Sequence, residues 1–268
     1  MNRFAVRRGP QKSRAGLAIK AGGAFLVLAA AGVGVWWLLT SATFSVNRVE
    51  SGSYRFTSRA ELEGALEEFL GRNIWTLSTD DISARLAQLP WVRDLRVSRS
   101  LPGTIEIDFR EWRPLWQVTA LRGVKITGTR PLVLIEDGRI LEFPSHVVMA
   151  GLPVLVGVPA VREGERGTLR VENGHMDQIM ELVSALEDAG LESVSPVDFI
   201  VARDEGYAIV LQDKRGILMV GRENFADRLN RYMTARDHLE PGLEVDLRFE
   251  DRLVVRQPEK DAAAFGGR

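Results

Sequence analysis

The sequence contains no cysteine. This absence excludes a disulfide scaffold and thiol chemistry, so each folded domain must be stabilised by its own apolar core. Hydrophobic residues make up 45% of the 268 residues, which is ordinary for globular domains and sufficient for such cores. The length allows one large or two modest folded domains.

Recognisable catalytic and metal-binding patterns are also missing. The three histidines, His146, His175 and His238, lie far apart, without an H-E-x-x-H motif or a carboxylate at ligand spacing. No S-x-x-K, G-x-S-x-G or phosphate-cradling glycine loop occurs. We expect no enzymatic activity, cofactor or metal. We interpret three pairs of adjacent acids as solvated helix or turn residues: Glu67-Glu68, Asp80-Asp81 and Glu250-Asp251.

Charge is absent from residues 21–47. The apolar part, residues 21–39, is about as long as a helix needs to cross a hydrocarbon core of roughly 30 Å. Its large side chains point around the whole helix, and Trp36 and Trp37 stand at one end, where indole rings prefer the headgroup level. The pattern predicts a transmembrane helix at residues 16–40.

Acidic residues are absent before Glu50, whereas six basic residues precede or enter the span. The positive-inside rule therefore predicts a cytoplasmic tail at residues 1–15 and a single-pass type II topology. A cleaved signal peptide is the alternative, although Thr40-Ser41-Ala42 is a poor cleavage site. Both interpretations send the remainder across the membrane. The whole chain has a formal charge of −1 and residues 1–40 carry +6, so the remainder carries −7. This negative charge argues against nucleic acid as a partner.

Residues 41–112 predict a small α+β domain. Residues 44–49 alternate apolar and polar side chains, as a half-buried strand does. Capping boxes at Ser58–Glu61 and Ser78–Asp81 predict the starts of two helices. Two alternating runs around Leu101-Pro102-Gly103 then predict a hairpin. The expected order is strand, helix, helix, strand, strand.

Residues 113–256 predict a second, mostly antiparallel α+β domain. A hairpin turns at Asp137-Gly138, and Asn173 and Asn224 are expected to cap two helices. The inward face of the first helix should comprise Met176, Ile179, Met180, Val183 and Leu186. Further strands are expected at residues 197–201, 207–211, 217–220, 243–249 and 253–255, and residues 257–268 should form a disordered tail.

Four short motifs carry a resemblance to a known family: Leu89-Pro90-Trp91-Val92, Leu101-Pro102-Gly103-Thr104, Glu111-Trp112-Arg113-Pro114 and Val245-Asp246-Leu247-Arg248-Phe249. In this order, after a single span, they resemble the FtsQ/DivIB family of bacterial cell-division proteins. The resemblance runs from residue 16 to about residue 256. It implies a POTRA domain of order β-α-α-β-β followed by a second extracytoplasmic, sheet-rich domain.

The resemblance also implies a function. The chain would be a non-enzymatic bitopic scaffold of the divisome, in the cell inner membrane at the septum with its bulk in the periplasm. Its partners would be FtsB and FtsL, and through them the septal peptidoglycan synthase. A POTRA-bearing component of outer-membrane protein export is an alternative, weakened because no barrel-like run of alternating strands is present. A membrane-anchored cell-wall enzyme is another, for which the sequence offers no residues.

The family's docking site for FtsB follows the motif at residues 245–249. Carried over, Arg248 would pair with a partner carboxylate and Phe249 would be the apolar anchor. Leu253 and Val255 would line an edge that a partner strand joins. The competing interpretation is that these apolar residues only complete the core. The expected partner-binding set is Arg248, Phe249, Glu250, Asp251, Leu253 and Val255.

Overall fold

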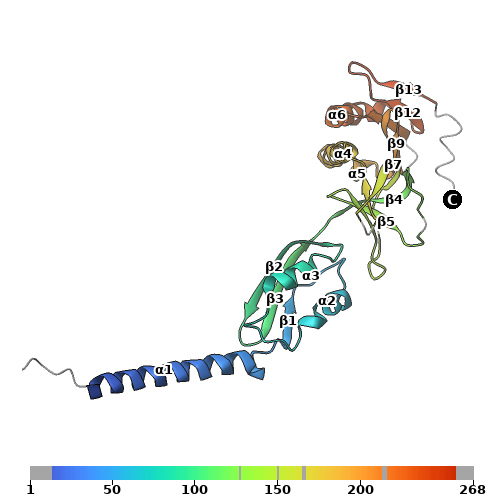
Figure 1. The fold of residues 1–268 in the computed structure, drawn as a ribbon. Coiled ribbons are helices and arrows are strands. Elements are labelled where there is room, and N and C mark those ends of the chain that lie inside the picture. The colour runs from blue at the N-terminus through green and yellow to red at the C-terminus, as the bar shows by residue number, and fades with distance from the viewer. Residues whose placement is uncertain (1–13, 127, 150, 165–166, 213–215, 258–268) are drawn as a thin grey trace, which may run out of the picture. The chain divides into compact units, whose positions relative to one another are not determined.

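The computed structural model describes residues 14–126, 128–149, 151–164, 167–212 and 216–257. The chain divides into two compact units (Figure 1). The first comprises Met1–Ser53 and Arg59–Arg110, and the second comprises Tyr54–Ser58 and Glu111–Arg268. Most of the predicted cytoplasmic tail and nearly all of the predicted disordered tail lie outside the described residues.

A long apolar helix, α1 (Arg14–Thr40), begins the described chain. Gly22–Thr40 has a mean hydropathy of 1.9 and is the one segment of the described chain long and apolar enough to cross a membrane. Its large apolar side chains from Phe25 to Trp36 are exposed: Phe25 is 72% exposed and Leu28 is 71% exposed. Such exposure would be costly in water and is the normal condition of a helix surrounded by lipid.

The folded part of the first unit is a three-stranded sheet with two helices. Its strands have the order β1-β3-β2, and β1 runs parallel to β3, with Arg48 opposite Thr104. In β3, Ile105, Ile107 and Phe109 alternate with exposed residues and face the core. The elements are β1 (Arg48–Ser51), α2 (Arg59–Leu66), α3 (Thr79–Leu86), β2 (Val92–Ser100) and β3 (Thr104–Glu111).

Local chemistry explains where two of these elements begin. The Ser78 hydroxyl accepts the backbone N–H of Asp81 at 3.3 Å, so the predicted cap of α3 is confirmed. The predicted strand at residues 44–49 is wrong at its start, because Ala42–Phe44 form a short 3-10 helix and β1 begins only at Arg48. The Ser41 hydroxyl accepts the N–H of Thr43 and so favours the helical turn over extended backbone.

The second unit is built on a ring of five strands. Among the described residues, β4 pairs with β5, β5 with β6, β6 with β8, β8 with β7, and β7 with β4. All of these ladders are antiparallel except β4–β7. The strands are β4 (Pro114–Arg122), β5 (Leu132–Ile135), β6 (Arg139–Glu142), β7 (Val154–Glu163) and β8 (Thr168–Val171).

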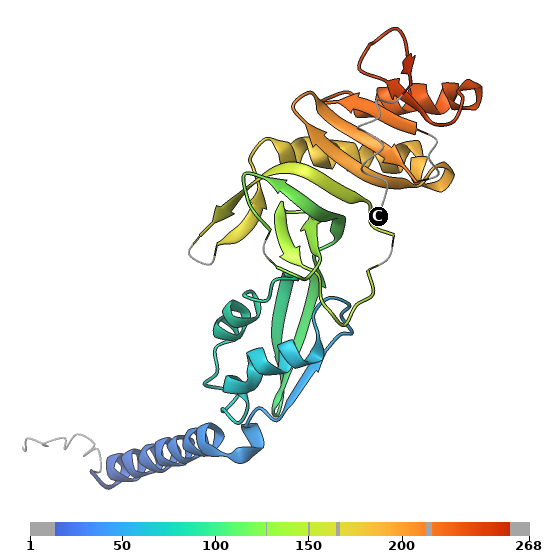
Figure 2. The same cartoon turned by 90° about the vertical axis from the view of Figure 1, so that its right-hand side faces the viewer.

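Five further strands extend this ring into one ten-stranded sheet. They follow β7 in the order β9-β10-β11-β12-β13, with β13 at the end. Helices α4 and α6 lie side by side on one face of this extension (Figures 1 and 2). The elements are α4 (His175–Ala189), α5 (Leu191–Val194), β9 (Val197–Arg203), β10 (Gly206–Leu211), β11 (Gly216–Gly221), α6 (Phe225–Ala235), β12 (Leu243–Asp246) and β13 (Val254–Arg256).

The helix starts of the second unit correct the sequence analysis. Gly174, with φ of +91°, caps α4 in place of Asn173, and the backbone there is left-handed. Asn224 does cap α6, but its φ is +57° and its side chain makes no capping hydrogen bond. Met180 is 37% exposed and does not belong to the buried face of α4, whereas Leu182 is fully buried.

The strand predictions need a second correction. The strand expected at residues 243–249 ends at Asp246, and the last strand comprises Val254–Arg256 rather than residues 253–255. Strands β4, β7 and β8 are not among the predicted strands. The segment between β12 and β13 is therefore an irregular loop, residues 247–253, and the candidate site lies on it.

Candidate functional site

Strand β13 is the open end of the ten-stranded sheet. At the other end β8 is paired along both of its sides, to β6 and to β7, whereas β13 pairs only with β12 in the described part of the chain. An edge strand presents a row of N–H and C=O groups that can pair with another chain. Val255 of β13 is 39% exposed, so apolar contact area accompanies the backbone groups.

The loop before β13 is held in shape by one arginine of α6. The guanidinium of Arg231 donates hydrogen bonds to the carbonyls of Phe249 at 2.7 Å and Glu250 at 2.5 Å. A third hydrogen bond reaches the carbonyl of Leu247 at 3.1 Å. Three backbone acceptors bound by one side chain fix the course of this loop more firmly than its irregular backbone would suggest.

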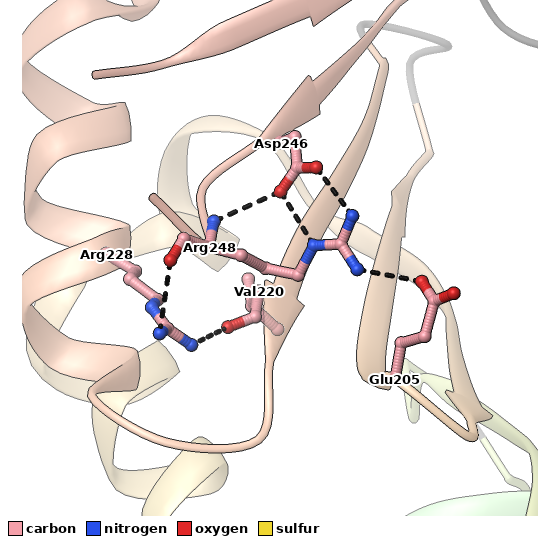
Figure 3. A network of polar contacts seen from close by, with 5 residues as sticks. All are labelled: Glu205, Val220, Arg228, Asp246 and Arg248. Carbon is pink, nitrogen blue, oxygen red and sulfur yellow. Dashed lines mark hydrogen bonds and ion pairs between the residues drawn. The ribbon is translucent and has the colours of Figure 1, made fainter. Parts of the chain in front are cut away.

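Asp246 and Arg248 form an ion pair at the end of β12 (Figure 3). Asp246 is 1% exposed, and its carboxylate accepts hydrogen bonds from Arg248 Nε at 2.8 Å and Nη2 at 2.7 Å. The backbone N–H of Arg248 donates to the same carboxylate at 3.1 Å. These bonds turn the chain out of the strand direction, which is why β12 stops at Asp246.

The same contacts set the charge state of the pair. The hydrogen bonds from the Arg248 side chain lower the pKa of Asp246 below its ordinary value, although burial opposes them. Hydrogen bonding to Asp246 in turn raises the pKa of Arg248. Arg248 Nη1 also donates to Glu205 Oε2 at 2.7 Å. The guanidinium predicted to meet a partner carboxylate therefore already has two carboxylates of its own chain.

A second arginine, Arg228, lies beneath this pair (Figure 3). It is only 9% exposed, and its guanidinium donates to the carbonyls of Val220 at 2.7 Å and Arg248 at 3.4 Å. Gly221, with φ of +76°, leaves the space for it, because a Cβ there would lie 2.6 Å from Arg228 Nη1. The backbone at Arg248 is thus supported from inside the unit.

The apolar residues of the predicted set differ in exposure. Phe249 is 36% exposed, and the guanidinium of Arg252 lies 5.1 Å from its ring centroid. Leu253 is partly buried and packs against the core of the second unit. An open groove of about 610 Å³ lies between α6 and the loop at residues 247–253. It is lined by Asp227, Asn230, Arg231, Thr234, Asp251, Arg252 and Leu253.

The structure thus places all six predicted site residues on one continuous segment. Arg248, Phe249, Glu250, Asp251 and Leu253 lie on the loop, and Val255 lies on β13. Sequence reasoning did not identify Asp246, Glu205, Arg228 and Arg231 as the residues that hold this segment. The two-residue spacing of Asp246 and Arg248 was the one local signal, since the other contacts join positions distant in sequence.

The described residues contain no group of three or more histidine, aspartate or glutamate side chains placed to hold a metal ion. Burial raises the pKa of Tyr207 to about 12, so this phenol stays protonated at neutral pH. The arrangement at β13 provides backbone pairing groups, exposed apolar area and charged side chains. These are the components of a protein–protein interface.

Comparison with known proteins agrees with this architecture. The model of the FtsQ-type POTRA domain matches residues 44–112. A cell division protein FtsQ of Koribacter versatilis is 28% identical over 98% of this chain and 77% of its own length. The FtsQ proteins of Rhodothermus marinus and Neisseria meningitidis serogroup B are 27% and 25% identical, over 90% and 88% of this chain and 88% and 94% of their own lengths. With an apolar N-terminal helix, an FtsQ-type POTRA domain and a sheet-rich second region in this order, the chain resembles the FtsQ cell-division proteins over nearly its whole length.

Proposed function

We propose that this chain is a non-enzymatic bitopic scaffold of the divisome. Helix α1 anchors it in the inner membrane with the N-terminus in the cytoplasm, and the two folded units stand in the periplasm at the septum. The proposed domains are a POTRA domain at residues 41–112 and a second domain at residues 113–256. A division of the chain into compact units close to Arg110 supports this boundary.

The proposed partners are FtsB and FtsL, which link the chain to the septal peptidoglycan synthase. A segment of FtsB adds a strand to β13, and main-chain hydrogen bonds supply much of the affinity. The observation that carries this proposal is the open edge of β13. Of the two strands at the ends of the ten-stranded sheet, β8 and β13, β13 is the one that is paired on a single side among the described residues.

The sheet of the POTRA unit offers further edges, and one of them is a poorer template. Strand β2 carries Arg93, Asp94 and Arg96 among its apolar residues, and Asp94 has a φ of +51°. Charged side chains and distorted backbone on an edge discourage strand addition. Strand β13 reads Val254-Val255-Arg256, which suits pairing better.

The loop residues complete the proposed interface. Phe249 supplies the apolar anchor, and Leu253 and Val255 line the approach to the edge. The exposed acids Glu250 and Asp251 can attract basic side chains of the partner. Asp246 holds Arg248 in one position, and a partner carboxylate would replace the exposed Glu205 at Nη1 of its guanidinium.

The proposal is tested by localisation and capture together. A fluorescent fusion of the full chain should form a band at mid-cell, and the chain should co-purify with FtsB from membranes. A fusion that ends at residue 40 keeps the span and lacks both folded domains, so it should label the envelope uniformly. Uniform labelling by the full chain, or co-purification with outer-membrane export components instead of FtsB, would contradict the proposal.

A further inference from the structure

Three large apolar side chains of the POTRA unit lie outside its core and are exposed. Leu70 is 49% exposed, Trp75 is 45% exposed and Leu101 is 55% exposed. Leu70 and Trp75 lie in the loop between α2 and α3, and Leu101 lies at the tip of the β2–β3 hairpin. We refer to these three residues as the apolar base.

Backbone hydrogen bonds bring the apolar base to the point where the chain enters the domain from α1. Ile74 N–H donates to the carbonyl of Phe44 at 2.8 Å, and Val46 N–H donates to the carbonyl of Arg72 at 2.8 Å. The hairpin tip is fastened to the same stretch, because Asn47 N–H donates to the carbonyl of Gly103 at 3.0 Å. Loop and tip are therefore both anchored to residues 44–47.

The entry point is close to the end of the span. Three residues separate Thr40, the last residue of α1, from Phe44, so the two Cα atoms are at most about 14 Å apart. The Phe44 ring lies 5.8 Å from the Trp37 ring and 6.1 Å from the Trp75 ring, centroid to centroid. Aromatic side chains thus continue without a break from the span into the apolar base.

A polar contact closes the same junction. The side-chain amide of Asn73 donates to the carbonyl of Leu38 at 2.9 Å. This carbonyl belongs to the last turn of α1, where backbone acceptors lack partners within the helix. Arg72, next in the loop, is exposed and can reach a lipid phosphate.

We propose that the apolar base rests in the headgroup layer of the membrane that α1 crosses, on the side of the folded domains. Indole rings and leucines flanked by a cation suit this layer, where one end of a side chain is apolar and the other is hydrated. The base then acts as a second membrane contact that orients the POTRA domain above the bilayer. The inference rests on the proposed span, and the experiment separates the two.

The test uses the absence of cysteine, because any single introduced cysteine is the only labelling site. Trp75→Cys and Leu101→Cys are prepared separately in the full chain, labelled with a polarity-sensitive fluorophore, and reconstituted into lipid nanodiscs that hold no other protein. Each variant leaves the other two residues of the base in place. Quenching by lipid that carries a spin label on its headgroup is then measured.

Two control positions are labelled in the same way, one far from the apolar base and one inside the span. Arg110→Cys is an exposed position in β3, six residues beyond Thr104 and therefore about 20 Å along the strand from the base. Val33→Cys lies in the middle of the span and should be quenched only by lipid labelled deep in the acyl chain. Circular dichroism identical to that of the parent chain verifies that each variant is folded.

We expect the labels at residues 75 and 101 to be quenched several-fold more strongly than the label at residue 110, with blue-shifted emission. Equal quenching at residues 75, 101 and 110, with Val33→Cys deep in the bilayer, would overturn the membrane contact and leave the span intact. A Val33→Cys label outside the acyl region would overturn the span, and the inference with it.

Discussion

At the residue scale, the contact between Asp246 and Arg248 determines the conformation of the loop that follows β12. A carboxylate that is 1% exposed is stable in this position because three hydrogen bonds from Arg248 replace its hydration. The same bonds shape the loop that carries the proposed interface. Stability and interface geometry are therefore coupled at this pair.

The lowered pKa of Asp246 predicts a pH dependence. The ionised form is favoured more in the folded than in the unfolded chain, so its stabilising contribution is complete above the unfolded pKa of about 4. It is lost as the pH falls through the lower, folded pKa. The free energy of unfolding of residues 41–268 should therefore decrease below about pH 4, as measured by urea denaturation.

Asp246→Asn supplies the comparison for that measurement. The amide keeps the shape of the side chain but cannot ionise, so the variant should be less stable at neutral pH and should lose less stability on acidification. A pH dependence identical to that of the parent domain would show that Asp246 does not carry the effect.

Phe249 and Leu253 should respond differently to substitution. Phe249→Ala should cost at least ~2 kcal/mol of partner binding with little change in melting temperature, because its ring is partly exposed. Leu253→Lys should lower both, since Leu253 also packs against the core. Val161→Ala, at a similarly exposed apolar position on β7, is the matched control and should change neither. If melting falls in proportion to binding for Phe249→Ala, this residue is core and not interface.

At the scale of elements, the edge position of strand β13 leads to a prediction about its first two amides, those of Val254 and Val255. In an antiparallel edge strand, neighbouring N–H groups alternate between the paired side and the open side. Of Val254→Pro and Val255→Pro, one should therefore weaken the β12–β13 ladder and lower the melting temperature. The other should spare stability and weaken partner capture. Equal effects of both substitutions on capture, with no difference in melting, would argue against strand addition.

Most elements of the POTRA unit could be predicted from the sequence, and the physical reasons are local. Alternation in β3 and the Ser78 cap of α3 depend on residues within a few positions of one another. In the second unit, Gly174 with its left-handed backbone displaced Asn173 as the cap. Strand β7 contains Gly157 and Pro159, and these residues obscure its pattern.

The candidate site was predictable only in part for the same reason. The segment 248–255 followed from a resemblance to a family, not from residue patterns. The residues that hold it act across long sequence separations: Glu205 on Arg248, and Arg231 on Phe249 and Glu250. The contact of Glu205 depends on the order of the strands in the sheet, and those of Arg231 depend on the packing of α6 against it. No local pattern encodes either.

At the scale of the whole molecule, the short connection between the span and β1 is expected to matter. Inserting about fifteen glycine and serine residues after Ser41 would release the POTRA domain from a fixed distance to the membrane. Cells that depend on this variant should divide poorly, whereas a foreign transmembrane helix with the original spacing should support division. Full complementation by the insertion would show that the span is only a tether.

If a partner adds a strand to β13, the backbone amides on the open side of β13 become hydrogen-bonded, and hydrogen–deuterium exchange measures this change. Exchange is measured in the full chain, with and without FtsB, on peptides that cover β13 and β8. Strand β8 is the control, since β6 and β7 already pair with it. We expect slower exchange in β13 on binding of FtsB and no change in β8. A complex that forms while exchange in β13 stays unchanged would contradict strand addition.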